Sequence, residues 1–365
     1  MADTTKDKIL TYALTPLSWI YGAVVSFRNY LFDKDILKSE RFNIPVITVG
    51  NLTVGGTGKT PHVEYLIDYL SAVYNVAVLS RGYMRKTKGF VLACDKSTPD
   101  TIGDEPYQIY QKYGFRVKVA VCENRKTGIR ELQKIDPNIN LVILDDGFQH
   151  RFIKPKVSIL LTEYNRPFYT DKLLPLGRLR EAIDSRHRAH FVIVTKCPEN
   201  ITPLNCRIMI NNLGLRAFQK TFFTRYTYNN IMPVFPNDSP YSVQLSSLTA
   251  DDGILLVSGI DNPRGFIKYF RQFNAKVKIA HYPDHHDFTR KDVENISKTF
   301  AKMNCARKLI ITTEKDAARL ACNPYFPHEL KPRTFYLPIS VHMINRPEEG
   351  DFMQMLKKLI DATEH

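Results

Sequence analysis

Six short apolar runs that alternate with amphipathic segments constrain the fold of this chain more than any other feature. They are rich in Val, Ile and Leu, a composition typical of strands buried on both faces of a parallel sheet. The runs are 46–49, 76–79, 117–121, 141–144, 157–161 and 191–194. The helical spacing of Val63, Leu66, Ile67 and Leu70 supplies a crossover after the first run. We therefore predict an α/β fold with a doubly wound sheet.

The pattern changes beyond the sixth run. Residues 211–248 are polar, aromatic and rich in Asn and Pro, which favours an extended or β-ribbon linker. A second set of α/β elements follows, with a closing helix that includes Phe352 and Leu356. The chain is thus divided into an N-terminal apolar helix (1–40), a first α/β domain (41–210), the linker (211–248) and a smaller C-terminal α/β domain (249–365).

A glycine-rich loop, GNLTVGGTGKT at 50–60, follows the first apolar run and opens a helix. Such a loop lets backbone N–H groups surround phosphate oxygens, while Lys59 reaches the outer phosphates and Thr60 can bind Mg²⁺. Thr53 stands where the usual pattern has glycine, and the double glycine resembles the deviant P-loop type. We predict a P-loop NTPase-type domain whose nucleotide site is formed by Val54, Gly55, Gly56, Thr57, Gly58, Lys59 and Thr60.

The fourth apolar run ends in two carboxylates, Asp145 and Asp146. A strand that ends in Asp-Asp-Gly is often only a turn. Beside a phosphate loop, however, the pair has the form of a Walker B element, in which one carboxylate holds Mg²⁺ and the other orients a neighbour. We predict a metal site made by Thr60, Asp145 and Asp146.

Other candidate residues lie near predicted strand ends or helix starts. Arg81 and Arg125 suit the neutralisation of a transferring phosphoryl group, and surface ion pairs are the alternative. Asp104 precedes an apparent helix, so a capping role competes with a catalytic one. Pro283 breaks the helix that would bring His281 and His285 onto one face, which argues against zinc and leaves a catalytic base or phosphate contact.

The net charge limits the classes of partner that the chain is expected to bind. Lys and Arg number 51 against 37 Asp and Glu, a net charge of +14, which favours phosphate-bearing partners: nucleic acid, an anionic membrane or a phosphorylated substrate. No helix-turn-helix, zinc or RNP-type motif supports nucleic acid. The sixth run is followed by Thr195-Lys196-Cys197, which lacks the Asn and Asp of a guanine-binding motif and argues against GTP. The six cysteines form no C-x-x-C pair, and we interpret them as reduced thiols of a cytosolic protein. An ATPase or GTPase switch and a nucleic-acid-associated ATPase remain the alternative functions.

The N-terminus carries 19 residues without charge, from Ile9 to Phe27. This length is just enough to span a bilayer, but the interspersed Pro16, Gly22, Thr and Ser favour a helix that lies in the interface, with Trp19 at headgroup depth. A helix buried on the protein body and a membrane span are the alternatives. The predicted inserted face consists of Leu14, Leu17, Ile20, Tyr21 and Val24.

Seven sequence blocks together resemble the tetraacyldisaccharide 4'-kinase family of lipid A biosynthesis. Each block alone is a weak signal, but seven in register over the whole chain are specific. They are GNLTVGGTGKTP (50–61), SRGY (80–83), GDEP (103–106), DDGFQH (145–150), LPLGRLRE (174–181), PDHH (283–286) and TEKDA (313–317).

The resemblance implies transfer of the γ-phosphoryl group of ATP, with Mg²⁺, to the 4'-hydroxyl of tetraacyldisaccharide 1-phosphate, which gives the lipid A precursor lipid IVA. It implies monotopic attachment to the anionic cytosolic face of the bacterial inner membrane, and two α/β domains joined by a β ribbon. It also assigns Asp104 to the active cleft, favours His285 over His286, and includes the carboxylate of Glu181. The predicted catalytic residues are Asp104, His285, Asp146, Arg81, Arg125 and Glu181.

Overall fold

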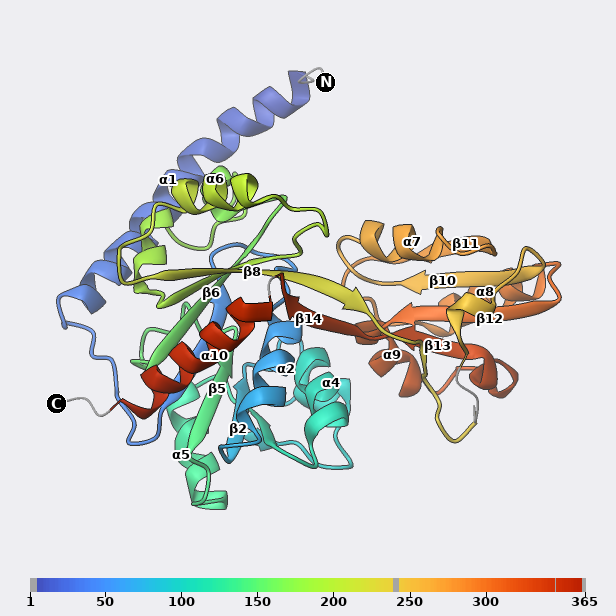
Figure 1. Cartoon of the computed structure of the whole chain (residues 1–365), viewed down its shortest axis with the longest axis horizontal. Helices are drawn as coiled ribbons and strands as arrows, with labels where there is room; N and C mark the ends of the chain where they lie inside the picture. Colours follow the sequence, from blue (N-terminus) through green and yellow to red (C-terminus); the bar gives the residue numbers. More distant parts are fainter. Residues whose placement is uncertain (1–4, 239–242, 345, 363–365) are drawn as a thin grey trace.

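The computed structural model describes residues 5–238, 243–344 and 346–362, which form two lobes, each built on a β-sheet (Figure 1). The first lobe contains β1 (Val46–Asn51), β2 (Val76–Ser80), β3 (Val91–Leu92), β4 (Lys118–Val121), β5 (Leu141–Asp145), β6 (Val157–Glu163), β7 (Phe191–Thr195), β8 (Lys220–Tyr228) and β14 (Ile339–Met343). Its helices are α1 (Thr5–Asp33), α2 (Lys59–Leu70), α3 (Pro99–Ile102), α4 (Asp104–Tyr113), α5 (Arg125–Ile135), α6 (Pro203–Leu213) and α10 (Arg346–Asp361).

The second lobe is smaller. Its strands are β9 (Met232–Pro233), β10 (Asp252–Ser258), β11 (Lys276–His281), β12 (Arg307–Thr313) and β13 (Thr334–Leu337), and its helices are α7 (Arg264–Phe270), α8 (Arg290–Ala301) and α9 (Glu314–Ala321). Short 3₁₀ helices lie at η1 (Phe168–Thr170), η2 (Ile183–Arg188), η3 (Leu245–Ser247) and η4 (His328–Arg333).

Parallel pairing dominates both sheets, which confirms the predicted α/β class. The large sheet has the order β14-β8-β7-β6-β1-β5-β2-β4-β3, and only β3 and β14 at its edges are antiparallel to their neighbours. The small sheet has the order β11-β10-β12-β13-β9, with β9 antiparallel. Because β1, β2, β4 and β5 are parallel, their carboxyl ends lie along one edge of the large sheet, where α/β proteins bind ligands.

Helices cover both faces of the large sheet. The core on one face joins the strands to α2, α4 and α10, and the other face packs against α5, α6 and the segment that contains Phe168 and Leu179. In the small sheet, α8 and α9 cover one face and α7 the other. These layers bury the apolar runs on both sides, as the sequence predicts.

The segment predicted as a linker is more deeply integrated than expected. The boundary at 210 falls inside α6, and β8 pairs with β7 on one side and β14 on the other. The chain passes between the lobes twice, from β8 towards β9 and from β13 through Pro338 to β14 (Figure 1). A polar, aromatic composition predicted extended structure here, but it does not reveal pairing with strands far along the chain.

The closing helix also corrects the predicted boundaries, because α10 packs on the first lobe and not on the C-terminal one. Phe352 is fully buried there, with ring centroids 5.3 Å from Phe191 and 5.0 Å from Phe222. Leu356 and Ile360 join the same core. The apolar periodicity of 352–360 predicts a buried helical face, but periodicity does not identify the sheet that covers it.

Candidate functional site

The phosphate loop lies between the end of β1 and the start of α2, as predicted. Gly55 has φ 101° and Gly58, which precedes the helix, has φ 91°. Both conformations favour glycine, and a Cβ at Gly55 would also collide with the Arg178 guanidinium. Arg178 donates to the Val54 carbonyl through two nitrogens, at 2.9 and 2.6 Å, and Lys196 Nζ donates to the Gly56 carbonyl at 2.6 Å. These contacts fix the loop at the N-terminus of α2, where an anion is favoured.

The end of β5 brings the predicted carboxylate pair beside this loop, since β5 pairs directly with β1. Asp146 lies 3.7 Å from Lys59 Nζ and accepts from Arg180 Nη1 at 3.1 Å. Burial raises the pKa of Asp146, but the charges of Lys59 and Arg180 outweigh it and hold that pKa below its usual value. Asp146 is thus kept ionised by two cations.

Asp145 is in a different environment. It is buried, and its Oδ1 has no hydrogen-bond partner among the described residues. Burial raises its pKa to about 7, and the neighbouring Asp146 and Glu105 add to the effect. A buried carboxylate oxygen without a partner costs free energy unless a cation satisfies it. The donor set therefore fits a hard cation such as Mg²⁺, with Thr60 at the adjacent start of α2.

Two predicted arginines lie at the same edge of the large sheet. Arg125 starts α5 and is buried, with Nη1 donating to the Cys122 carbonyl at 2.9 Å. Burial lowers its pKa to about 10, while the charges of Asp145 and Asp146 oppose that shift. Arg81 follows β2, is exposed, and lines a cavity of about 360 Å³ formed by residues 81–88 and Glu123.

Asp104 and His285 meet across the lobes. Asp104 is the first residue of α4, and Gly103 occupies the capping position, so the capping interpretation of Asp104 is wrong. Its buried carboxylate contacts His285 Nδ1 at 2.9 Å. Burial raises the pKa of Asp104, but the hydrogen bonds of His285 and Arg319 outweigh it and lower that pKa. His286 contacts Asp292 instead, at 2.9 Å.

Glu181 is buried among different partners. Its carboxylate accepts from Asn29 of α1 at 2.8 Å, from Arg188 at 2.9 Å and from Ser185 at 3.0 Å. Tyr21 of α1 donates to the neighbouring Arg180 carbonyl at 2.9 Å. These contacts attach α1 to the first lobe, and Glu181 is engaged in them.

The outer face of α1 is exposed and apolar. Trp19 is 73% exposed, and its exposed apolar neighbours are Tyr12, Leu17, Ile20, Val24, Phe27 and Tyr30. Tyr21 points inward, so the predicted inserted face is wrong at this residue. Leu204 and Ile208 of α6 are also exposed, and α1 and α6 both pack on the segment around Tyr169 and Leu173. Within the described residues, no helix combines the length and apolarity needed to cross a bilayer.

Sequence reasoning missed three residues that complete the site. Arg319 of α9 forms two hydrogen bonds with Asp104, each 2.8 Å long. Arg180 pairs with Asp146 as described above, and His62 packs behind the phosphate loop with Nδ1 2.7 Å from the Gly58 carbonyl. Arg180 lies within the block LPLGRLRE and His62 directly follows the block GNLTVGGTGKTP, so membership of the blocks was a signal for both. Arg319 lies two residues beyond the block TEKDA, but its contact with Asp104 joins residues 215 positions apart in the chain.

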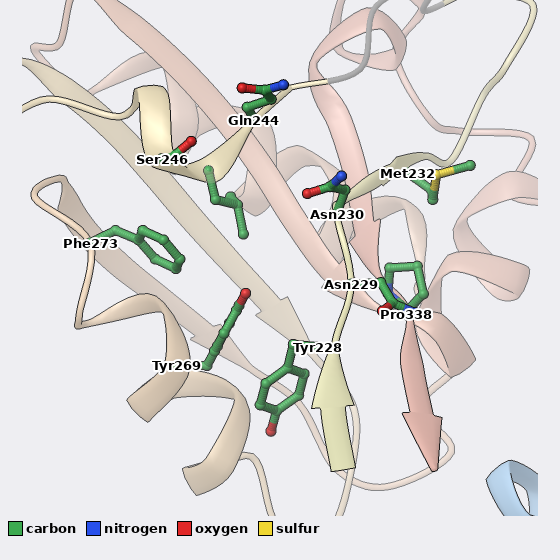
Figure 2. A pocket seen from close by; sticks show the side chains of 10 residues that line it. Tyr228, Asn229, Asn230, Met232, Gln244, Ser246, Tyr269, Phe273 and Pro338 are labelled. Atoms are coloured by element: carbon green, nitrogen blue, oxygen red, sulfur yellow. The ribbon is translucent and has the colours of Figure 1, made fainter. Parts of the chain in front are cut away.

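A larger cavity of about 730 Å³ opens where the chain crosses between the lobes (Figure 2). Tyr228, Tyr269 and Phe273 supply aromatic rings, and Asn229, Asn230 and Gln244 supply amides (Figure 2). Its lining includes none of the predicted site residues. The predicted site residues therefore lie at the sheet edge and not in this cavity.

The chain is similar to known proteins over nearly its whole length. The family model described as tetraacyldisaccharide-1-P 4'-kinase matches residues 10–361. The chain is 48% identical to a tetraacyldisaccharide 4'-kinase of Bacteroides thetaiotaomicron over 343 residues, covering 92% of this chain and 90% of the relative. It is 41% identical to one of Flavobacterium johnsoniae, covering 97% and 99%.

A solved structure is also similar. It is a crystal structure of LpxK from Aquifex aeolicus in complex with ATP, with a TM-score of 0.72 and 28% sequence identity. The match covers 96% of this chain and 99% of the other.

The unpartnered carboxylate of Asp145 generates a stability prediction. Asp145→Asn removes a buried negative charge, so without divalent cations we expect the variant to be more stable than the wild type by about 1–3 kcal/mol. Added Mg²⁺ should raise the melting temperature of the wild type and leave that of the variant nearly unchanged. Thermal unfolding with EDTA and with Mg²⁺ measures both effects, and Asp351→Asn, at an exposed position of α10, is the control. An equal response of wild type and variant to Mg²⁺ contradicts the metal assignment.

Proposed function

Because the chain belongs to the tetraacyldisaccharide-1-P 4'-kinase family, we propose that it transfers the γ-phosphoryl group of ATP to the 4'-hydroxyl of tetraacyldisaccharide 1-phosphate. One observation carries the proposal: the phosphate loop, the Asp145–Asp146 pair and the Asp104–His285 pair gather around one edge of the large sheet. Gly103, next to Asp104, packs against the 82–83 segment that follows β2, and the charge of Glu105 acts on Asp145. Phosphoryl transfer needs this combination of anion binding, charge neutralisation and a proton acceptor.

The nucleotide phosphates are bound by the loop 54–60. Its backbone N–H groups and the N-terminus of α2 attract the β- and γ-phosphates, and Lys59 supplies a point charge beside them. Thr60, Asp145 and Asp146 would hold Mg²⁺, which supplies neutralisation of phosphate charge. The unpartnered oxygen of Asp145 favours this residue as the direct ligand, because Asp146 already accepts from Arg180.

The acceptor hydroxyl is activated by the Asp104–His285 pair. With Nδ1–H donated to Asp104, the neutral imidazole of His285 has its lone pair on Nε2, which can accept the proton of the 4'-hydroxyl. As that proton leaves, the 4'-oxygen bonds to the γ-phosphorus and the bond to the bridging β,γ-oxygen breaks, which releases ADP. Arg81 and Arg125 contribute positive potential at the same edge, and Glu181 positions α1 relative to it.

Incubation with labelled ATP and tetraacyldisaccharide 1-phosphate would test the proposed activity. The wild type should yield a labelled lipid, and Lys59→Ala should reduce the rate at least about a hundredfold because it loses charge stabilisation at the phosphates. The exposed Lys134→Ala should behave as the wild type. ATP hydrolysis without labelled lipid would instead favour a nucleotide-dependent switch.

The Asp104–His285 contact predicts that the two residues act as one unit. Asp104→Ala and His285→Ala should each lower kcat about a hundredfold or more with little change in the KM for ATP, and the double variant should be scarcely worse than the poorer single one. Steady-state kinetics of the three variants measure this, with the exposed His328→Ala as control. Losses that multiply, or an unchanged kcat in Asp104→Ala, would contradict a joint role.

The exposed face of α1 supports peripheral attachment to the cytosolic face of the inner membrane. Leu17, Trp19, Ile20, Val24 and Phe27 offer apolar area to the acyl boundary, while the opposite side of the helix is committed to the first lobe. The net charge of +14 adds attraction to anionic headgroups. A lipid acceptor would then meet the enzyme at the membrane surface.

Polar substitutions on this face should weaken membrane binding without unfolding the lobe. We expect the combined variant Leu17→Gln/Ile20→Gln/Val24→Gln to bind vesicles of phosphatidylethanolamine and phosphatidylglycerol at least tenfold more weakly, because each side chain contributes about 1 kcal/mol of burial. The control Val73→Gln/Phe115→Gln/Ile135→Gln replaces equally exposed apolar residues elsewhere on the first lobe. Co-sedimentation measures the difference, and equal binding of the two variants would refute attachment through α1.

A further inference from the structure

Arg319 occupies a position that the proposed chemistry does not explain. It lies near the end of α9 in the second lobe, and its side chain is only 11% exposed. Nε donates to Oδ1 of Asp104 and Nη2 to Oδ2, both at 2.8 Å. This two-point contact is the geometry that a planar guanidinium forms with a carboxylate, and a lysine cannot reproduce it.

The same guanidinium also holds the other member of the pair. Arg319 Nη1 donates to the backbone carbonyl of His285 and to Asp287 Oδ1, the latter at 3.1 Å. His285 has φ 56°, a left-handed conformation that is costly for a residue with a side chain and persists only where neighbours fix it. Lys315, one turn earlier in α9, pairs with Asp284 at 2.9 Å. Two cations of α9 therefore fix the 284–287 turn.

We propose that Arg319 is the positioning residue that fixes the Asp104–His285 pair across the two lobes, so that Asp104 orients the imidazole and Nε2 of His285 remains the proton acceptor. This inference rests on the proposed function. Arg319 touches neither ATP nor the acceptor in this role; it acts through Asp104 and through the backbone of His285.

The charges around the pair support this division of roles. Both oxygens of Asp104 accept from Arg319, and Oδ2 also contacts His285 Nδ1. Asp104 is thereby committed as an acceptor. The Nε2 atom of His285 lies 4.0 Å from Glu105 and 3.9 Å from Asp284, beyond hydrogen-bond distance of either carboxylate. The ring of Tyr83 packs edge-on against the imidazole at 5.3 Å.

The contact also links catalysis to the docking of the lobes. Asp104 begins α4 of the first lobe, whereas His285 and Arg319 belong to the second. At the other end of the two helices, Lys112 of α4 pairs with Glu314 of α9. The pair is therefore complete only while α9 lies against α4, and Arg319 makes its assembly depend on that docking.

Steady-state kinetics of the full chain test the proposal. Arg319→Gln should lower kcat about tenfold to a hundredfold and change the KM for ATP less than about twofold, because the nucleotide site is untouched. Arg319→Lys should recover part of the loss. Arg290→Gln, which removes an exposed cation on α8, should match the wild type. A kcat of Arg319→Gln within twofold of the wild type would overturn the proposal.

The pH dependence separates positioning from a merely structural role. Without the positive charge of the guanidinium, the hydrogen-bonded Asp104–His285 pair is easier to protonate as a unit, so the acid limb of the kcat profile should move to higher pH in Arg319→Gln. In Arg319→Lys, which keeps a positive charge facing Asp104, Glu105, Asp284 and Asp287, the limb should stay near that of the wild type. An unmoved limb in Arg319→Gln, with no recovery in Arg319→Lys, would overturn the proposal.

A spectroscopic measurement on the unliganded protein is independent of kinase activity. The Nδ1 proton of His285, hydrogen-bonded to Asp104, should give a low-field proton resonance that disappears in His285→Gln. It should be lost or shifted upfield in Arg319→Gln and retained in Arg290→Gln. An unchanged resonance in Arg319→Gln would refute the positioning role even if the wild type failed to phosphorylate the lipid, whereas failure of that assay alone would count only against the proposed function.

Discussion

Parallel pairing of β1 with β5 is the constraint on which the site depends. It aligns Val49 with Asp145, so the phosphate loop and the carboxylate pair leave the sheet side by side. An antiparallel partner would send its carboxyl end to the opposite edge. The crossover helices that parallel pairing requires supply α2, whose N-terminus attracts phosphate. The arrangement of the fold and that of the proposed nucleotide site therefore both depend on this parallel pairing.

The α4–α9 interface is the second constraint, because it brings Asp104 of the first lobe into contact with His285 and Arg319 of the second. Each helix supplies a cation that pairs with a carboxylate of the other: Arg319 of α9 pairs with Asp104 of α4, and Lys112 of α4 pairs with Glu314 of α9. The resulting register places His285 against Asp104. The proposed proton acceptor is therefore assembled from both lobes, and its geometry depends on the contact between them.

Local patterns predicted the parts of the site that lie within one segment. The loop around Lys59 and the carboxylates that end at Asp146 need only a strand, a turn and a helix start, and their residues encode all three. Sequence patterns did not predict the contacts between segments that are distant along the chain. Three such contacts are the packing of Phe352 on the large sheet, the hydrogen bond of Tyr21 to Arg180 and the pairing of Arg319 with Asp104. They were not predicted because side-chain periodicity indicates which face of an element is buried and does not identify the element that covers it.

A buried charge cluster at the α4–α9 interface affects the register of the two helices more than the stability of their contact. Lys112 contacts Glu64 at 2.7 Å and also Glu314, so one cation faces a buried carboxylate and a largely buried one. Burial raises the pKa of Glu64 to about 7 and raises that of Glu314 as well. Buried ion clusters of this kind recover little more than their desolvation cost, but they penalise misaligned arrangements strongly. The cluster thus favours one register of α9 on α4 while adding little net stability, and that register is the one in which Asp104 contacts His285.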